Sequence, residues 1–323
     1  MIPTTVATRV SILVLLAHAT SAAPHIARRS TTYNDGIHLA IGPTCGIPSS
    51  NGSAADVNAG LGELSTFKTI VSFGDAFTSN GKSDGSAPDP PVQTGTNPKY
   101  GGRFANGYVW VENLANDMGA HLLDYAVPGA VTDTAIWPGK ANESSFVKQV
   151  SVFKNQSRIF EPKTTLYSVF FGINDYIASE KDGDHMIEAA EALLGQIERL
   201  SRAPINARHF LVIDNYGRGF YAASGSAFKT RVFNGLSTMR KNISHSKFAY
   251  VDFAYLWDGV LKTPGFWEFG YNSTVWCTSN STSTVGACPD PAHTFYWIEG
   301  HPSKQTHRIM TDYIEEVLAE CKT

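Results

Sequence analysis

Short apolar runs alternate with segments of helical periodicity along most of the chain. Runs rich in β-branched and aromatic residues indicate buried strands, and apolar residues that recur every three or four positions indicate helices. The strand-like runs are Thr69–Phe73, His121–Tyr125, Leu166–Phe171, His209–Ile213 and Ala249–Phe253. The helical patterns are Val109–Met118, Asp184–Leu200, Arg231–Asn242 and Gln305–Cys321.

This alternation predicts the α/β class. Strands that alternate with helices form a parallel sheet with helices on both faces. The strand-like runs are mostly apolar rather than alternating, as expected where both faces of a sheet are covered. We therefore predict a three-layer α/β/α domain over residues 61–323, with a central parallel sheet of about five strands. Two long irregular stretches, Ser83–Gly102 and Trp257–Ala292, are expected to shape a pocket.

The first 60 residues have a different pattern. The apolar run Val10–Ala17 is followed by small residues at Thr20–Ala23, which is the order of a secretory signal peptide. We predict a signal peptide over residues 1–23 and an irregular N-terminal segment over residues 24–60. Arg28-Arg29 is a candidate processing site within that segment. The protein is therefore expected to be secreted and extracellular.

Composition narrows the choice of partners. A chain of 323 residues, 42% hydrophobic and 17% charged, suits one large globular domain. The net charge of −3 and the pI near 6.4 argue against a polyanionic partner such as nucleic acid. No later stretch is apolar and long enough to span a membrane, so we expect no membrane association. A monomer is the default expectation.

Sequons and cysteines fit secretion. Acceptor sequons for N-glycosylation occur at Asn51, Asn142, Asn155, Asn242, Asn272 and Asn280, and most are expected on surface loops. The four cysteines are compatible with two disulfides, whereas a metal site is disfavoured because no two have ligand spacing. Four cysteines allow three connectivities. We favour Cys277–Cys288, which brackets a polar loop, together with Cys45–Cys321, which joins the ends of the domain.

Candidate site residues follow the predicted strands, where open α/β sheets carry their chemistry. Gly74-Asp75-Ala76 is the sharp exit from the first strand. The second and third strands lead into Asp124-Tyr-Ala-Val-Pro-Gly129 and Phe171-Gly-Ile-Asn-Asp175. A fourth motif, Tyr296-Trp-Ile-Glu-Gly-His-Pro-Ser303, precedes the last helix and contains His301.

In this order, and with Gly102–Gly107 between the first two, the segments resemble the GDSL (SGNH) hydrolases over nearly all of the mature chain. The resemblance implies the SGNH-hydrolase fold, which is flavodoxin-like, and a serine-esterase mechanism without a metal or organic cofactor. It implies that His301 is the general base. The oxyanion hole would consist of the backbone N–H groups of Ala76 and Gly129 and the side-chain amide of Asn174.

Each of these residues also has a purely structural interpretation. Gly129 would then be a turn glycine, Asn174 a helix cap and His301 a surface imidazole. The Gly102–Gly107 segment is interpreted mainly as the entry to a helix. The first motif upstream favours the catalytic interpretation of Asn174. The aromatic pair before His301 and the predicted helix after it favour the catalytic interpretation of His301.

The chain departs from the family pattern at two positions. The family's catalytic serine is Ala76, and the aspartate three residues before the histidine is Ile298. A backbone carbonyl or another carboxylate, Glu299 or Asp290, can replace the aspartate. Losing a serine nucleophile, however, costs on the order of 10⁶ in turnover, so this form is expected to be near-inactive. An engineered Ser-to-Ala change and a natural pseudoenzyme both explain Ala76.

The substrate class follows from a narrower resemblance. The motifs, long loops, signal peptide and sequons look most like fungal acetylesterases of carbohydrate esterase family sixteen, which implies acetyl esters on xylo-oligosaccharides and similar plant-wall sugars as substrates. Asp75, Asp175, Tyr176 and Trp297 are expected to bind the substrate, and Trp137 is a further candidate for stacking on sugar rings. The alternatives are a non-catalytic carbohydrate-binding protein and a GDSL lipase. A lipase is disfavoured because the sequence has no long apolar lid or amphipathic membrane helix.

Overall fold

The computed structural model describes residues 1, 36–48, 60–243 and 245–322, so the predicted signal peptide, Arg28-Arg29 and Asn51 lie outside the described residues. Five parallel strands form one sheet in the order β2-β1-β3-β4-β5. The strands are β1 (Thr69–Gly74), β2 (His121–Asp124), β3 (Thr165–Phe170), β4 (His209–Asp214) and β5 (Lys247–Asp252). All five predicted strands are confirmed, and this strand order is the flavodoxin-like one.

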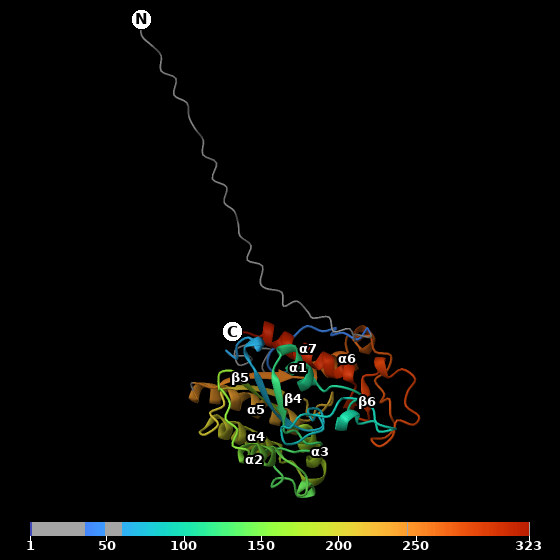
Figure 1. Ribbon diagram of the computed structural model, residues 1–323, viewed down its shortest axis with the longest axis horizontal. Helices are drawn as coiled ribbons and strands as arrows, with labels where there is room; N and C mark the ends of the chain where they lie inside the picture. The colour runs from blue at the N-terminus through green and yellow to red at the C-terminus, as the bar shows by residue number, and fades with distance from the viewer. Residues whose placement is uncertain (2–35, 49–59, 244, 323) are drawn as a thin grey trace. The chain divides into compact units, whose positions relative to one another are not determined.

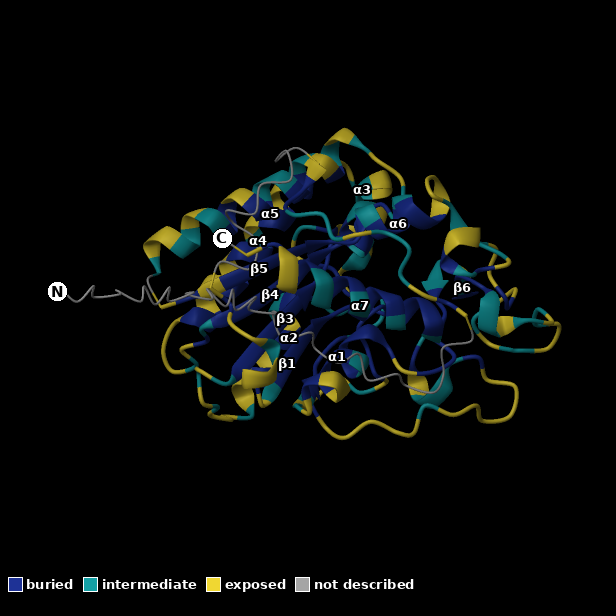
Figure 2. Ribbon diagram, turned by 90° about the horizontal axis from the view of Figure 1, so that it is seen from above, coloured by how far each residue is buried: buried dark blue, intermediate teal, exposed yellow. Residues whose placement is uncertain are grey.

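Helices cover both faces of the sheet, which confirms the predicted three-layer α/β/α architecture (Figure 1). On one face lie α1 (Trp110–Met118) and α7 (Lys304–Glu320). On the other lie α2 (Phe146–Asn155), α4 (Met186–Ser201) and α5 (Ala223–Asn242). Figure 2 shows that the strands between these layers are buried.

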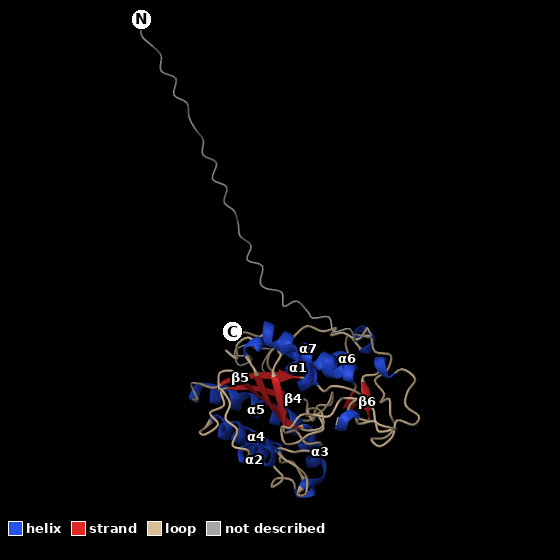
Figure 3. Cartoon of the chain, in the orientation of Figure 1, coloured by secondary structure: helices blue, strands red, loops and turns tan. Residues whose placement is uncertain are grey.

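Shorter elements connect the main strands and helices. The helices α3 (Ile173–Asp182) and α6 (Ala254–Leu261) begin a few residues after β3 and β5. A small antiparallel ribbon pairs β6 (Tyr296–Ile298) with β7 (His301–Pro302). The 3₁₀ helices are η3 (Leu64–Thr66), η4 (Tyr100–Gly102), η5 (Pro138–Lys140), η6 (Phe266–Phe269) and η7 (Pro291–His293). Figure 3 shows that long loops surround β6.

The sequence pattern missed α2, α3 and α6 and the first two turns of α5. Three valines in α2 lower its helix propensity, and Ser and Gly at the start of α5 do the same there. Tertiary packing overrides that weak propensity at Gly225, where an added Cβ would lie 1.9 Å from the ring of Tyr216. The loop predicted over Trp257–Ala292 begins later than expected, because α6 continues to Leu261.

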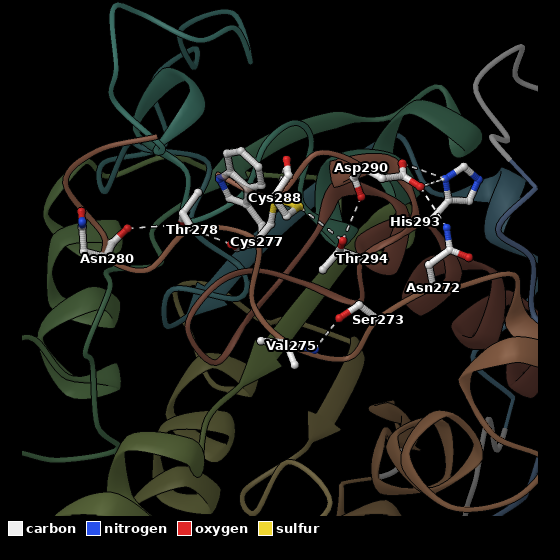
Figure 4. The surroundings of a disulfide bond; sticks show 11 residues. Asn272, Ser273, Val275, Cys277, Thr278, Asn280, Cys288, Asp290, His293 and Thr294 are labelled. Atoms are coloured by element: carbon white, nitrogen blue, oxygen red, sulfur yellow. Dashed lines mark hydrogen bonds and ion pairs between the residues drawn. A yellow bond between two sulfur atoms is a disulfide. The ribbon is translucent and has the colours of Figure 1, made fainter. Parts of the chain in front are cut away.

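Both predicted disulfides are present. Cys45–Cys321 joins the N-terminal segment to the end of α7, and Cys277–Cys288 closes a loop beside β6 (Figure 4). The described part of the irregular segment, residues 36–48, packs on the core through Ile37 and Ile47. The segment is therefore tied to the domain by a covalent bond and by buried apolar contacts.

The described sequon asparagines are all on the surface. All five have an exposed side chain: Asn142, Asn155, Asn242, Asn272 and Asn280. Exposure is a requirement for glycosylation, which stays a prediction. Within the described ranges, every helix is too short or too polar to cross a bilayer.

Candidate active site

A pocket with a volume of about 340 Å³ lies at the carboxyl edge of the sheet. The strands β1 and β3 end side by side, with Gly74 paired to Phe170, so the segments that follow them meet at this edge. The strand order reverses between β1 and β3, which is where open α/β sheets bind ligands. Four lining residues are the predicted catalytic and oxyanion positions Ala76, Gly129, Asn174 and His301. The others are Asp75, Phe77, Phe104, Pro128, Ile173, Ile177 and Arg218.

The residue after Asp75 is an alanine, which presents only a methyl group to the pocket. Ala76 is 7% exposed, and the described lining contains no serine, threonine or cysteine. The turn around it is rigid, because the Asp75 carboxylate accepts a hydrogen bond from the Phe77 backbone N–H at 2.9 Å. The described lining therefore offers neither a hydroxyl nor a thiol.

Two backbone donors around Ala76 are available to an oxyanion. In the described part of the chain, the N–H groups of Ala76 and Gly129 have no hydrogen-bond acceptor. Gly129 has a φ of +81°, a left-handed conformation that favours glycine. Donors that are already oriented stabilise a developing negative charge most effectively.

The third predicted donor is engaged with the protein. The Asn174 Nδ2 donates to the Asp75 carboxylate at 3.1 Å and to the Ala130 carbonyl at 3.0 Å. An oxyanion would have to replace one of these two acceptors. The helix-cap interpretation of Asn174 is wrong, because the N-cap of α3 is Gly172 and has no side-chain hydrogen bond.

A backbone carbonyl orients His301. Its Nδ1 lies 2.8 Å from the carbonyl oxygen of Glu299. A carbonyl oxygen only accepts, so Nδ1 carries the proton and Nε2 is the basic nitrogen. Of the replacements for the family's aspartate, the carbonyl is therefore the one found. Asp290 pairs instead with His293 at 2.9 Å (Figure 4), and no described carboxylate binds the His301 ring.

The surroundings of His301 keep its imidazole neutral. The ring packs against Phe104 and Phe77, with centroids 4.8 and 5.9 Å away. Burial lowers the pKa of His301 to about 4, and the Arg218 and Lys99 charges act in the same direction, while the hydrogen bond to Glu299 opposes them. The imidazole is thus a neutral acceptor over the whole physiological range.

This gives a testable pH dependence. Since the pKa of His301 is lowered, its imidazole should become charged only as the pH falls through about 4. NMR titration of the ring should show this midpoint. A Phe104→Ala variant should move the midpoint up towards 6.5, because water then reaches the ring. A midpoint near 6.5 in the unsubstituted chain would contradict the buried environment.

Asp75 borders the pocket as predicted, but Asp175 does not. Burial raises the pKa of Asp75 to about 7, against the lowering effect of the Phe77 N–H. The Asp175 carboxylate accepts from the Thr132 hydroxyl at 2.6 Å and from the Trp137 indole at 2.8 Å. Because Thr132 follows Gly129 closely, Asp175 supports the loop that carries Gly129.

The aromatic residues predicted to stack on sugars also lie outside the pocket lining. Trp297 is buried and donates to the Pro98 carbonyl at 2.7 Å, within a cluster that includes Cys277 and Ile298. Tyr176 packs on Tyr216, with ring centroids 5.3 Å apart. Trp137 is fully buried. Apolar cores recruit most aromatic side chains, and these three follow that rule.

Sequence reasoning missed Phe104 and Arg218. Phe104 lies in Gly102–Gly107, a segment interpreted mainly as a helix entry, yet its ring covers His301. Arg218 stands in the turn after β4, where its N–H donates to the Asn215 carbonyl at 3.2 Å. The only sequence signal for Arg218 is its place just beyond a strand end. The described residues contain no cluster of three or more His, Cys, Asp or Glu that could hold a metal ion.

Comparisons with known proteins identify related sequences. The sequence pattern of the GDSL-like lipase/acylhydrolase family matches residues 70–314. A thermolabile hemolysin of Vibrio parahaemolyticus is 28% identical over 152 residues, which cover 45% of this chain and 32% of that protein. A phosphatidylcholine-sterol acyltransferase of Aeromonas hydrophila is 30% identical over 140 residues, 38% of each chain. The matched region thus spans about a third of the length of these relatives.

Among solved structures, one similar chain is a family two carbohydrate esterase from Clostridium thermocellum in complex with cellohexaose. It has a TM-score of 0.42 and 14% sequence identity. The match covers 77% of this chain and 62% of that one.

Proposed function

Because this chain belongs to the GDSL-like lipase/acylhydrolase family, we propose that its pocket is an ester-binding, acyl-transfer site that lacks the nucleophile. One observation carries the proposal. A neutral His301 and the unoccupied N–H groups of Ala76 and Gly129 border the same pocket as the Ala76 methyl group. This arrangement matches what acyl transfer requires except for the attacking oxygen.

A serine at position 76 would complete the reaction. Its hydroxyl would attack the ester carbonyl while the Nε2 of His301 takes the proton, forming a tetrahedral intermediate. The N–H groups of residue 76 and Gly129 would hold the oxyanion, and Asn174 would join them by releasing Asp75 or the Ala130 carbonyl. His301 would then return the proton to the leaving alcohol, and water would release the acid by the same route. With Ala76, binding remains and the covalent step is lost.

The ligand we propose is an acetyl ester on a xylo-oligosaccharide or similar plant-wall sugar, as in the acetylesterases of carbohydrate esterase family sixteen. A volume of about 340 Å³ lies near the lower end for ligand pockets and suits a short acyl group. Secretion is part of the proposal, supported by the two disulfides and the exposed sequon asparagines. We propose a monomer without nucleic-acid or membrane partners.

An ester of a longer acyl chain is the second candidate, favoured by the lipid named for the Aeromonas relative. An Ala76→Ser variant assayed on nitrophenyl acetate, butyrate and octanoate separates the two. We expect kcat/KM to fall at least about tenfold from acetate to octanoate, because the small pocket cannot enclose the longer chain. Acetylated xylo-oligosaccharides should also be deacetylated. A rise in kcat/KM with chain length would favour the lipase.

A further inference from the structure

We propose that the pocket selects ligands bearing a carboxylate, which pairs with the Arg218 guanidinium on the His301 side. The inference deepens the proposed function, on which it rests, by naming the substrate class: an ester whose acyl or alcohol part is anionic. An acetylated sugar that carries a uronic acid belongs to this class.

Arg218 has unused hydrogen-bonding capacity. Its side chain lines the pocket, and its only hydrogen bond in the described part of the chain is from Nη1 to the Gly300 carbonyl at 3.5 Å. No described carboxylate lies within 4.0 Å of the Arg218 guanidinium, the distance at which the two would form an ion pair. A guanidinium has five N–H donors in a planar fork that matches a carboxylate. A half-buried guanidinium without such a partner, beside a pocket, is suited to a ligand that supplies one.

The backbone at Arg218 has an uncommon conformation, and the neighbouring Gly300 leaves space for the guanidinium. Arg218 has a φ of +48°, an uncommon conformation for a residue with a side chain, and it persists only when the surroundings determine it. Opposite it, Gly300 also has a left-handed φ of +67°. A Cβ at Gly300 would lie 2.6 Å from the Arg218 Nη1. The absence of a side chain at residue 300 therefore makes room for the guanidinium.

A second cation lies on the same side. The Lys99 Nζ lies 4.2 Å from the centroid of the Phe104 ring, which packs against His301. Lys99 likewise has no carboxylate partner among the described residues. Both cations lower the pKa of His301, in keeping with their place near the imidazole. A ligand carboxylate on this side would meet two positive charges.

The nearest acidic group of the pocket lies close enough to Arg218 for the guanidinium charge to lower its pKa, but it forms no ion pair with Arg218. The Asp75 carboxylate is buried and accepts from the Phe77 N–H and from Asn174, and its pKa is raised to about 7. The exposed Glu143 lies near Gly129, where its Oε2 would be 3.6 Å from an added Cβ. The charges are therefore unevenly placed, with two cations near His301 and the Glu143 carboxylate, outside the pocket lining, near Gly129. This placement would direct an anionic ligand towards Arg218.

Binding to the unsubstituted chain tests this inference, since Ala76 prevents turnover. Two matched pairs of esters separate the sources of the charge: 4-acetoxybenzoate against 4-acetoxybenzamide for the alcohol part, and monophenyl succinate against phenyl butyrate for the acyl part. By calorimetry, the acid of at least one pair should bind about tenfold more tightly than its neutral partner. Arg218→Gln should abolish that preference and Arg218→Lys should keep part of it. The control Arg199→Gln, at an exposed position in the last turn of α4, should leave it unchanged.

Equal binding of acid and neutral ester in both pairs would overturn the inference, as would a preference that survives Arg218→Gln. The unfolding midpoint of each variant shows whether it is folded, and Arg218→Lys carries the test if Arg218→Gln is not. A failure of the proposed function would give a different result from a failure of this inference. If Ala76→Ser does not hydrolyse nitrophenyl acetate while the preference for acids persists, acyl transfer is wrong and carboxylate binding stands.

Discussion

Replacing Ala76 with serine should raise the rate of nitrophenyl acetate hydrolysis roughly 10³- to 10⁵-fold over this chain. In serine hydrolases the nucleophile contributes on the order of 10⁶ to turnover, and the orienting acid on the order of 10⁴. The Glu299 carbonyl performs the orienting part of that acid's role, since it holds Nδ1 of His301 at 2.8 Å. It carries no full charge to stabilise an imidazolium, so we expect less than the complete gain.

His301 provides the control for this prediction. In the Ala76→Ser background, a further His301→Ala change should return the rate to that of the unsubstituted chain, because no other described lining residue is an imidazole. Steady-state kinetics of the three proteins at neutral pH are sufficient. A folded Ala76→Ser protein without hydrolysis would contradict the acyl-transfer site and leave only a binding pocket.

Removing the Cys45–Cys321 disulfide should lower the free energy of unfolding by about 5 kcal/mol. The bond closes a loop with a sequence separation of 276 residues, so it strongly restricts the unfolded chain. It also joins residues 36–48 to the end of α7, beside the buried Ile37 and Ile47. A Cys45→Ser/Cys321→Ser variant should unfold roughly 8 °C below the unsubstituted protein.

The second disulfide is the matched comparison. Cys277–Cys288 has a sequence separation of only 11, so its removal should cost about 3 kcal/mol and roughly 5 °C. Thermal and urea unfolding of both double variants would give the two values. A larger loss from the shorter loop would show that strain or local packing, rather than chain entropy, determines the effect of these bonds.

The two departures from the family pattern have different structural consequences. Ala76 keeps the turn and its backbone N–H, so the missing hydroxyl is a local loss of chemistry. Ile298 is 2% exposed and packs with Trp297 and Cys277, so this position belongs to an apolar cluster. His301 remains oriented because its partner is a backbone atom, which does not depend on the identity of residue 298.

The sequence by itself determined the sheet and the place of the site. Apolar runs report burial locally, and glycine-rich exits from strands report turns, so β1 to β5 and the segments that carry Ala76, Gly129 and Asn174 were predictable. The sequence also indicated both disulfide pairs. It did not show that Asp175 and Trp297 lie outside the pocket lining, because adjacency to a motif does not show which way a side chain points.

Only the tertiary structure decided which groups meet in the pocket. His301 owes its neutral state to Phe104, which lies far from it in the chain, and Arg218 reaches the pocket from the turn after β4. The Glu299 carbonyl replaces the missing aspartate through the geometry of the turn between β6 and β7. Periodicity and motifs describe neighbours along the chain. Burial, pKa and unpaired charge depend on neighbours in space, and these are set when distant segments pack at one edge of the sheet.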